Sequence, residues 1–217
     1  MFKKTILGVV ISGFALSAQA GYSKENNVNH FTQEKNYYCQ AAVIQMYNTW
    51  IRENSWFDLH THTQDEIAEH IGARDSNWGF GVRDMAEALE DFTPFYGYYF
   101  SPYNTSSKDT FVKKIIAENE GDDPVVVVTR TRRTDNTYRA VGHYTIIDGF
   151  EQNSSQYQKS VSSTTGFYVK DPMWDSNTSK SAFSDYKAID PRTAFPQQEF
   201  MSDVVGMSKN RYYLVYR

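Results

Sequence analysis

The chain has 217 residues, of which 40% are hydrophobic, so it is long enough to enclose a core. Its formal net charge of −4 argues against nucleic acid as the main partner, because binding to phosphates needs concentrated positive charge. A single cysteine excludes an intramolecular disulfide. These features are typical of a globular protein and exclude a disulfide-stapled scaffold.

Residues 1–20 have the three parts of a secretory signal peptide. Lys3 and Lys4 form a positively charged N-terminal region, and the apolar run Thr5–Ser17 that follows is too short to span a bilayer. Ala18–Ala20 is a small-x-small cleavage site. A membrane anchor is disfavoured because polar sequence follows at once. We predict export to the periplasm or the extracellular space, and one domain over residues 21–217 with no integral membrane segment after processing.

Helical patterns dominate the first half of that predicted domain. Residues 21–37 are polar and turn-rich, and they predict an extended lead-in. Apolar residues then recur at helical spacing, and Thr63 and Glu66 have the spacing of a capping box. The predicted helices cover Cys39–Arg52, Thr63–His70, Val82–Glu90 and Lys108–Asn119.

Strand patterns dominate the second half. The β-branched run Val125–Val128 predicts a strand that is buried on both faces. Arg130–Asn136 is expected to form a charged turn and Gln152–Ser163 a surface loop. Further strands are predicted at His143–Phe150, Gly166–Lys170 and Tyr212–Tyr216. Helices followed by antiparallel strands predict an α+β fold.

The lone cysteine, Cys39, stands at the start of the first predicted helix. An unpaired thiol in an oxidising compartment is a liability unless its reactivity is used. Cysteine attacks as the thiolate, and the positive end of a helix dipole favours that anion. We therefore predict that Cys39 is the nucleophile of a hydrolase; the alternative is a small hydrophobe in the core.

Three polar residues supply the partners that a nucleophilic cysteine requires. His143 begins a strand behind a glycine, which leaves its ring open on one side, and it is the expected base. Asp171, fixed by Pro172 at the end of a strand, is expected to orient the imidazole. Gln33 precedes Cys39 and is expected to donate its side-chain amide to an oxyanion, with the Cys39 N–H as second donor.

Five segments follow one another along the chain: Gln33-x5-Cys39 running into Ala41-Ala42, Thr63–Ala68, Pro124–Val127, Gly142–Gly149 and Tyr168–Pro172. In this order they resemble the papain superfamily of cysteine peptidases, and more closely its double-glycine (bacteriocin-leader) peptidase-like branch. The resemblance implies a papain-like fold with the Cys39 helix packed on an antiparallel sheet. It implies Cys39 as nucleophile, His143 as general base and acid, Asp171 as orienting residue and Gln33 as oxyanion donor. No cofactor is expected.

One departure from that family is Gln40, which stands where glycine often follows the nucleophile. It is expected either to narrow the cleft or to contact the substrate. No transporter segment accompanies the peptidase pattern, so the resemblance does not imply leader cleavage. The predicted function is a secreted or periplasmic cysteine peptidase acting on a peptide or protein. The alternatives are a papain-fold acyltransferase, deamidase or cell-wall amidase, a non-catalytic binding module, and a structural envelope protein.

A zinc site is one interpretation of three histidines that are close in the sequence, His60, His62 and His70. Their spacing fits no well-formed zinc motif, and the sequence shows no cysteine or acidic partner for them. We therefore predict a solvated loop ahead of the second helix and no metal.

Overall fold

The computed structural model describes residues 21–56, 59–73, 81–93, 99–175, 177, 180–205 and 211–216. The predicted signal peptide, residues 1–20, lies outside the described residues. Among the helices that are described, none is long and apolar enough to cross a membrane.

Helices and antiparallel strands together form the described part of the chain. The helices are α1 (Cys39–Asn54), α2 (Gln64–His70), α3 (Val82–Phe92), α4 (Lys108–Glu120) and α5 (Gln197–Val205). The strands are β1 (Tyr22–Glu25), β2 (Phe100–Thr105), β3 (Val125–Arg133), β4 (Tyr138–Gln152), β5 (Thr164–Lys170), β6 (Trp174–Asp175), β7 (Lys180–Ser181), β8 (Tyr186–Lys187), β9 (Phe195–Pro196) and β10 (Arg211–Tyr216). The predicted α+β class is confirmed.

The main sheet is antiparallel and centred on the long strand β4. Its order is β2-β10-β3-β4-β5-β9, while β1 pairs with β4, β8 pairs with β3, and β6 and β7 form a separate ribbon. The pairing of β3 with β4 sets Thr129 opposite His143. At the other end of β4, a side chain at Gly149 would overlap the Lys24 carbonyl, so glycine lets β1 dock there.

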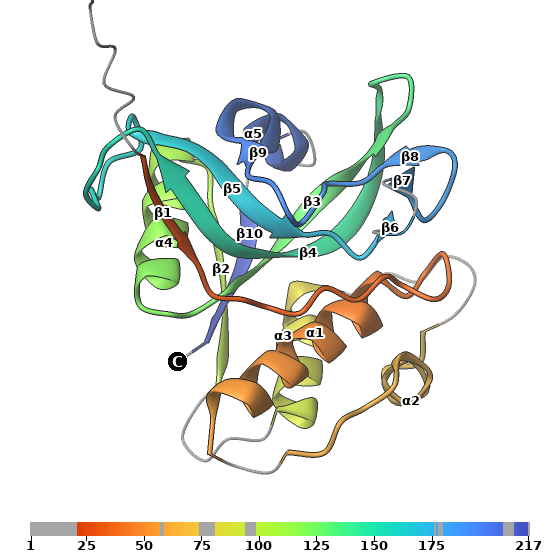
Figure 1. The fold of residues 1–217 in the computed structure, drawn as a ribbon. Coiled ribbons are helices and arrows are strands. Elements are labelled where there is room, and N and C mark those ends of the chain that lie inside the picture. The colour runs from red at the N-terminus through yellow and green to blue at the C-terminus, as the bar shows by residue number, and fades with distance from the viewer. Residues whose placement is uncertain are drawn as a thin grey trace, which may run out of the picture.

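Helices cover both faces of this sheet (Figure 1). The α1, α2 and α3 side encloses one apolar cluster, which includes Val126 from β3. The α4 and α5 side encloses a second cluster, which includes Val125 and Val127. Alternation along β3 sends successive side chains to opposite faces, so the valine run is buried on both sides as predicted.

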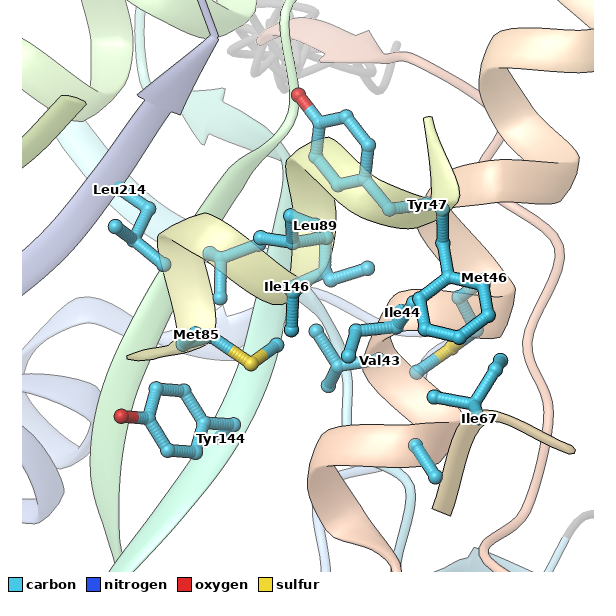
Figure 2. Packing of buried hydrophobic residues seen from close by; sticks show 14 of the residues in the cluster. Val43, Ile44, Met46, Tyr47, Ile67, Met85, Leu89, Tyr144, Ile146 and Leu214 are labelled. Carbon is cyan, nitrogen blue, oxygen red and sulfur yellow. The ribbon is translucent and has the colours of Figure 1, made fainter. Parts of the chain in front are cut away.

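The packing of α1 fixes how the helix that begins at Cys39 lies on the sheet. Val43, Ile44 and Met46 are fully buried, in one cluster with Ile67 of α2, Met85 and Leu89 of α3 and Ile146 of β4 (Figure 2). Burying side chains of this size stabilises the fold by about 1.5–3 kcal/mol each. Tyr47 adds a hydrogen bond from its hydroxyl to the Pro124 carbonyl, 3.0 Å away, at the start of β3. The first turn of α1 is therefore held in one place relative to the sheet.

Two predicted boundaries were wrong. Strand β4 begins at Tyr138, so His143 lies within the strand and does not begin it. The charged segment Arg130–Asn136 is not all turn, because β3 continues through Arg133. Thr131 and Arg132 pair with β4, and Arg132 and Arg133 also pair with β8. These backbone pairings stabilise an extended conformation that the charged side chains alone did not indicate.

Candidate active site

Cys39 occupies the first position of α1. Tyr38 is the N-cap residue, and its carbonyl accepts from Ala42 N at 2.9 Å. The Cys39 N–H therefore belongs to the first turn, whose N–H groups have no acceptor within the helix. The side chain of Cys39 is buried, and its Sγ donates to Gln40 Oε1 at 3.1 Å. The thiol of Cys39 and a backbone N–H without an acceptor in the helix thus both lie at the positive end of α1.

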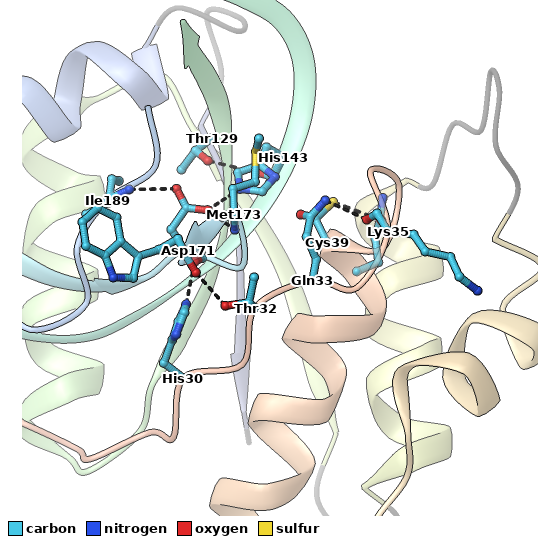
Figure 3. Close-up of polar contacts among 12 residues, drawn as sticks. His30, Thr32, Gln33, Lys35, Cys39, Thr129, His143, Asp171, Met173 and Ile189 are labelled. Atoms are coloured by element: carbon cyan, nitrogen blue, oxygen red, sulfur yellow. Dashed lines mark hydrogen bonds and ion pairs between the residues drawn. The ribbon is translucent and has the colours of Figure 1, made fainter. Parts of the chain in front are cut away.

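His143 and Asp171 form a buried pair. His143 Nε2 lies 2.7 Å from Asp171 Oδ1, and the two side chains are 5% and 7% exposed (Figure 3). His143 comes from β4 and Asp171 from the turn after β5, the strand next to β4. Because Nε2 faces the carboxylate, Nδ1 is the ring nitrogen left for the thiol.

The charge state of His143 reflects both of its partners. Burial by itself lowers the pKa of this imidazole, but the carboxylate of Asp171 and a hydrogen bond and charge from Cys39 outweigh it and raise the pKa to about 10. The influence of Cys39 on this pKa places its thiol near the His143 ring, while the hydrogen bond of Cys39 Sγ goes to Gln40 Oε1 at 3.1 Å. The structure therefore brings Cys39 close to the hydrogen-bonded pair of His143 and Asp171.

Asp171 is held by the local turn that follows β5. Its carbonyl accepts from Trp174 N at 3.0 Å, and Oδ1 also accepts from Met173 N at 2.9 Å. Pro172 suits the second position of such a turn, because its ring fixes φ near −65°. Oδ2 accepts from Ile189 N at 3.1 Å, so the carboxylate is fixed at both oxygens.

These contacts keep Asp171 ionised. Burial raises the pKa of its carboxyl group, but the charge of His143 and the donated hydrogen bonds lower the pKa further, so that it ends below its ordinary value. A charged carboxylate beside a buried imidazole favours the imidazolium.

Gln33 lies at the turn that leads into Cys39. Its Nε2 donates to the Lys35 carbonyl at 2.9 Å, and Tyr38 N donates to the same carbonyl at 3.0 Å. Its backbone N–H donates to the Pro172 carbonyl at 2.7 Å, which joins this turn to the Asp171 turn. One N–H of the Gln33 amide is thus used for positioning, and the second is left for a ligand.

Within the part of the chain that the structure describes, the oxygen of the Gln33 side-chain amide, unlike its nitrogen, is unpaired. Gln33 Oε1 is buried, and it has no hydrogen-bond partner among the described residues. A buried polar atom without a partner costs about 1–3 kcal/mol. Oε1 is an acceptor, so its lack of a partner does not bear on the amide N–H that would act as an oxyanion donor.

Gln64 holds the backbone on both sides of Gln33, a role that the sequence did not indicate. Its Oε1 accepts from Glu34 N at 2.9 Å, and its Nε2 donates to the Thr32 carbonyl at 2.9 Å. Gln64 is 2% exposed and also donates to Gln45 Oε1 of α1 at 3.1 Å. The capping box of α2 orients the helix that carries it.

The lead-in segment also binds the Asp171 turn, and this too was missed. His30 Nε2 lies 2.8 Å from the Asp171 carbonyl, and Thr32 Oγ1 donates to the Trp174 carbonyl at 2.7 Å. The partners are 141 and 142 residues apart in the chain, and no local pattern could reveal the pairing.

A helix with a cysteine in its first turn, packed on an antiparallel sheet that carries histidine and aspartate, has the papain-like cysteine peptidase fold. The chain matches the model of the Peptidase_C39 like family over residues 25–194, and it belongs to this family. The expected resemblance is thereby confirmed. A comparison with curated proteins finds no match.

Proposed function

We propose that the protein is an exported cysteine peptidase that hydrolyses peptide bonds through Cys39, His143 and Asp171. The observation that carries this proposal is the position of His143, whose ring contacts the Asp171 carboxylate and lies close enough to Cys39 for that residue to raise the pKa of the imidazole. Membership of a peptidase family supports a peptide or protein as the substrate class.

In the first half of the reaction, the Cys39 thiolate attacks the carbonyl carbon and a C–S bond forms. The second N–H of the Gln33 amide and the backbone N–H of Cys39 stabilise the oxyanion that develops. The His143 imidazolium then gives its Nδ1 proton to the amine, the C–N bond breaks, and a thioester remains.

In the second half, neutral His143 takes a proton from water, which attacks the thioester through a second oxyanion. The C–S bond breaks, the acid product leaves, and His143 is again the imidazolium opposite the Cys39 thiolate. Asp171 keeps one tautomer and one ring orientation through both halves, because its oxygens are fixed by Met173 and Ile189.

Cleavage of a proteome-derived peptide library tests this proposal. Wild type is expected to generate new peptide termini, and Cys39→Ala is expected to generate none. Equal cleavage by both proteins would overturn the nucleophile assignment. Release of ammonia, or of hydroxamates with hydroxylamine, without new termini would instead indicate a deamidase or another acyl transfer. No turnover with either readout would indicate a non-catalytic binding module.

Export is a separate part of the proposal, supported by the signal-peptide pattern of residues 1–20. Mass measurement of the protein recovered outside the cytoplasm is expected to give a chain that begins at Gly21. An unprocessed chain retained in the cytoplasm would contradict export without affecting the chemistry.

A further inference from the structure

Three of the five histidines of the chain gather beside Phe92, at the end of α3. The ring centroids of His62 and His70 lie 4.8 Å and 5.0 Å from that of Phe92. The ring of His60 lies 4.8 Å from that of His62. None of these histidines is needed for the proposed peptidase chemistry.

Glu66 adds a carboxylate to two of these imidazoles. One ligand atom each from His60, His62 and Glu66 lie within 4.8 Å of one another. The two histidines belong to the loop before α2, whereas Glu66 belongs to its first turn. The sequence did not indicate this acidic partner, because only the turn into α2 directs Glu66 back toward the loop.

These three groups are close to a coordination geometry. Ligands bound to Zn²⁺ at about 2.0–2.2 Å stand about 3.4 Å apart in a tetrahedron. The required approach is at most about 1.4 Å, and His60 is an exposed side chain that can rotate into place. Two imidazole nitrogens and one carboxylate oxygen suit Zn²⁺, Cu²⁺ or Ni²⁺, with water completing the shell.

Two of the three groups are already held in position. Glu66 Oε2 accepts from Thr63 N at 2.8 Å and from Thr63 Oγ1 at 3.0 Å, which fixes the carboxylate. The carbonyl of His62 accepts from Gln45 Nε2 at 3.1 Å, and its ring packs edge-on against Phe92. Only His60 has to move, and this limits the entropy lost on binding.

We propose that His60, His62 and Glu66 form a surface site for one divalent transition-metal ion. A bound ion would tie the loop before α2 to the helix itself, and it would stabilise the fold by mass action. This site replaces the solvated, metal-free loop that the sequence predicts. The inference does not depend on the proposed peptidase activity.

Zinc titration by calorimetry tests the proposal, with the full processed chain carrying Cys39→Ala. That background removes the Cys39 thiol, which would itself bind zinc beside His143. The test variants are His60→Ala and Glu66→Gln; glutamine at position 66 keeps the capping box but removes the charged ligand. The matched control is His70→Ala, which removes a histidine of the same patch from outside the ligand set.

We expect one zinc ion per chain, and at least about tenfold weaker binding in His60→Ala and in Glu66→Gln. Binding by His70→Ala should be unchanged. Zinc should also raise the melting temperature of the background protein but not of the two ligand variants, with all melting curves alike in a chelator. No saturable binding would overturn the proposal, as would unchanged affinity in the ligand variants. Loss of binding in His70→Ala alone would overturn this ligand set.

Discussion

The carboxylate of Asp171 is kept ionised by the groups that contact its two oxygens. Its two carboxylate oxygens receive the His143 ring and the N–H groups of Met173 and Ile189. Asparagine at this position would be nearly the same size, but it would replace one acceptor by a donor and remove the negative charge. The imidazole would then lose the group that sets its tautomer.

Asp171→Asn is therefore expected to lower kcat by up to about 10⁴-fold, while leaving measurable turnover. His143→Ala should abolish turnover more completely, because it removes the proton donor itself. Steady-state kinetics on one cleaved peptide checks this order. Equal activity of Asp171→Asn and wild type would contradict the orienting role.

Gln33→Ala is expected to lower kcat by about 10²–10³-fold with little change in KM. The reason is that its amide would stabilise charge that develops only in the transition state. The comparison of kcat and KM on the same peptide is the measurement. A rise in KM at constant kcat would show that Gln33 binds substrate and does not stabilise the oxyanion.

Each site residue that could be predicted from the sequence lies in a recognisable local sequence pattern. Cys39 begins an amphipathic helix, His143 follows a glycine, and Asp171 precedes a proline. Gln64 and His30 have none, because their roles depend on contacts with residues 30 and 141 positions away. Such pairings exist only after the chain has folded.

Among the elements, α2 acts on the site without contributing a reacting group. Through Gln64 it holds the backbone at Thr32 and Glu34, on either side of Gln33. Gln64 also bridges to Gln45 of α1, so the nucleophile helix and the Gln33 segment share one anchor. Gln64 is a positioning residue in this account.

Gln64→Ala is expected to lower kcat and to cost about 1–3 kcal/mol of stability, because buried hydrogen-bonding groups lose their partner. In a Gln33→Ala background the same substitution should lower kcat much less, since both act on the oxyanion donor. Gln45→Ala is the control, because it removes the contact of Gln64 with α1 and leaves the contacts of Gln64 with Thr32 and Glu34 intact. Additive effects of Gln64→Ala and Gln33→Ala on kcat would contradict the positioning role.

Elements with a clear periodicity or a capping pattern were predicted, whereas α5, β2 and the two-residue strands were not. The capping box at Thr63 and the periodicity of Lys108–Asn119 placed α2 and α4 within one residue of their ends. The two-residue strands β6 to β9 have no periodicity, since pairing alone defines them. Arg132 and Arg133 read as turn residues by composition, but their pairing with β8 keeps them extended.

On the scale of the whole molecule, the site is formed where three distant parts of the chain meet. The first turn of α1, the middle of β4 and the turn after β5 carry Cys39, His143 and Asp171, and the lead-in segment joins the first to the third. The lead-in segment is also held by Asp148, whose Oδ1 accepts from Val28 N at 3.0 Å. Asp148 is in turn fixed by a buried ion pair with Lys170 (Nζ to Oδ2, 2.9 Å).

The His143 pair also predicts how global stability depends on pH. The pKa of His143 is raised from its ordinary value near 6.5 to about 10 in the folded protein. The stability that it contributes is therefore fully present below about pH 6.5 and is lost as the pH rises through 10. Asp171 has a lowered pKa, so its contribution is present above its ordinary value and is lost as the pH falls.

Melting temperatures between about pH 6.5 and 10 are thus expected to fall more steeply for wild type than for His143→Gln. The difference between the two curves isolates His143 from groups common to both proteins. Parallel curves would show that His143 is not held as an imidazolium.

The rate at which iodoacetamide alkylates Cys39 tests the central claim most directly, because it needs no knowledge of the substrate. At about pH 6, where free cysteine is almost entirely protonated, we expect Cys39 of the wild type to react faster than free cysteine. The His143→Ala variant should lose that excess. A wild-type rate at or below that of free cysteine, or an equal rate in His143→Ala, would contradict a thiolate–imidazolium pair at Cys39 and His143.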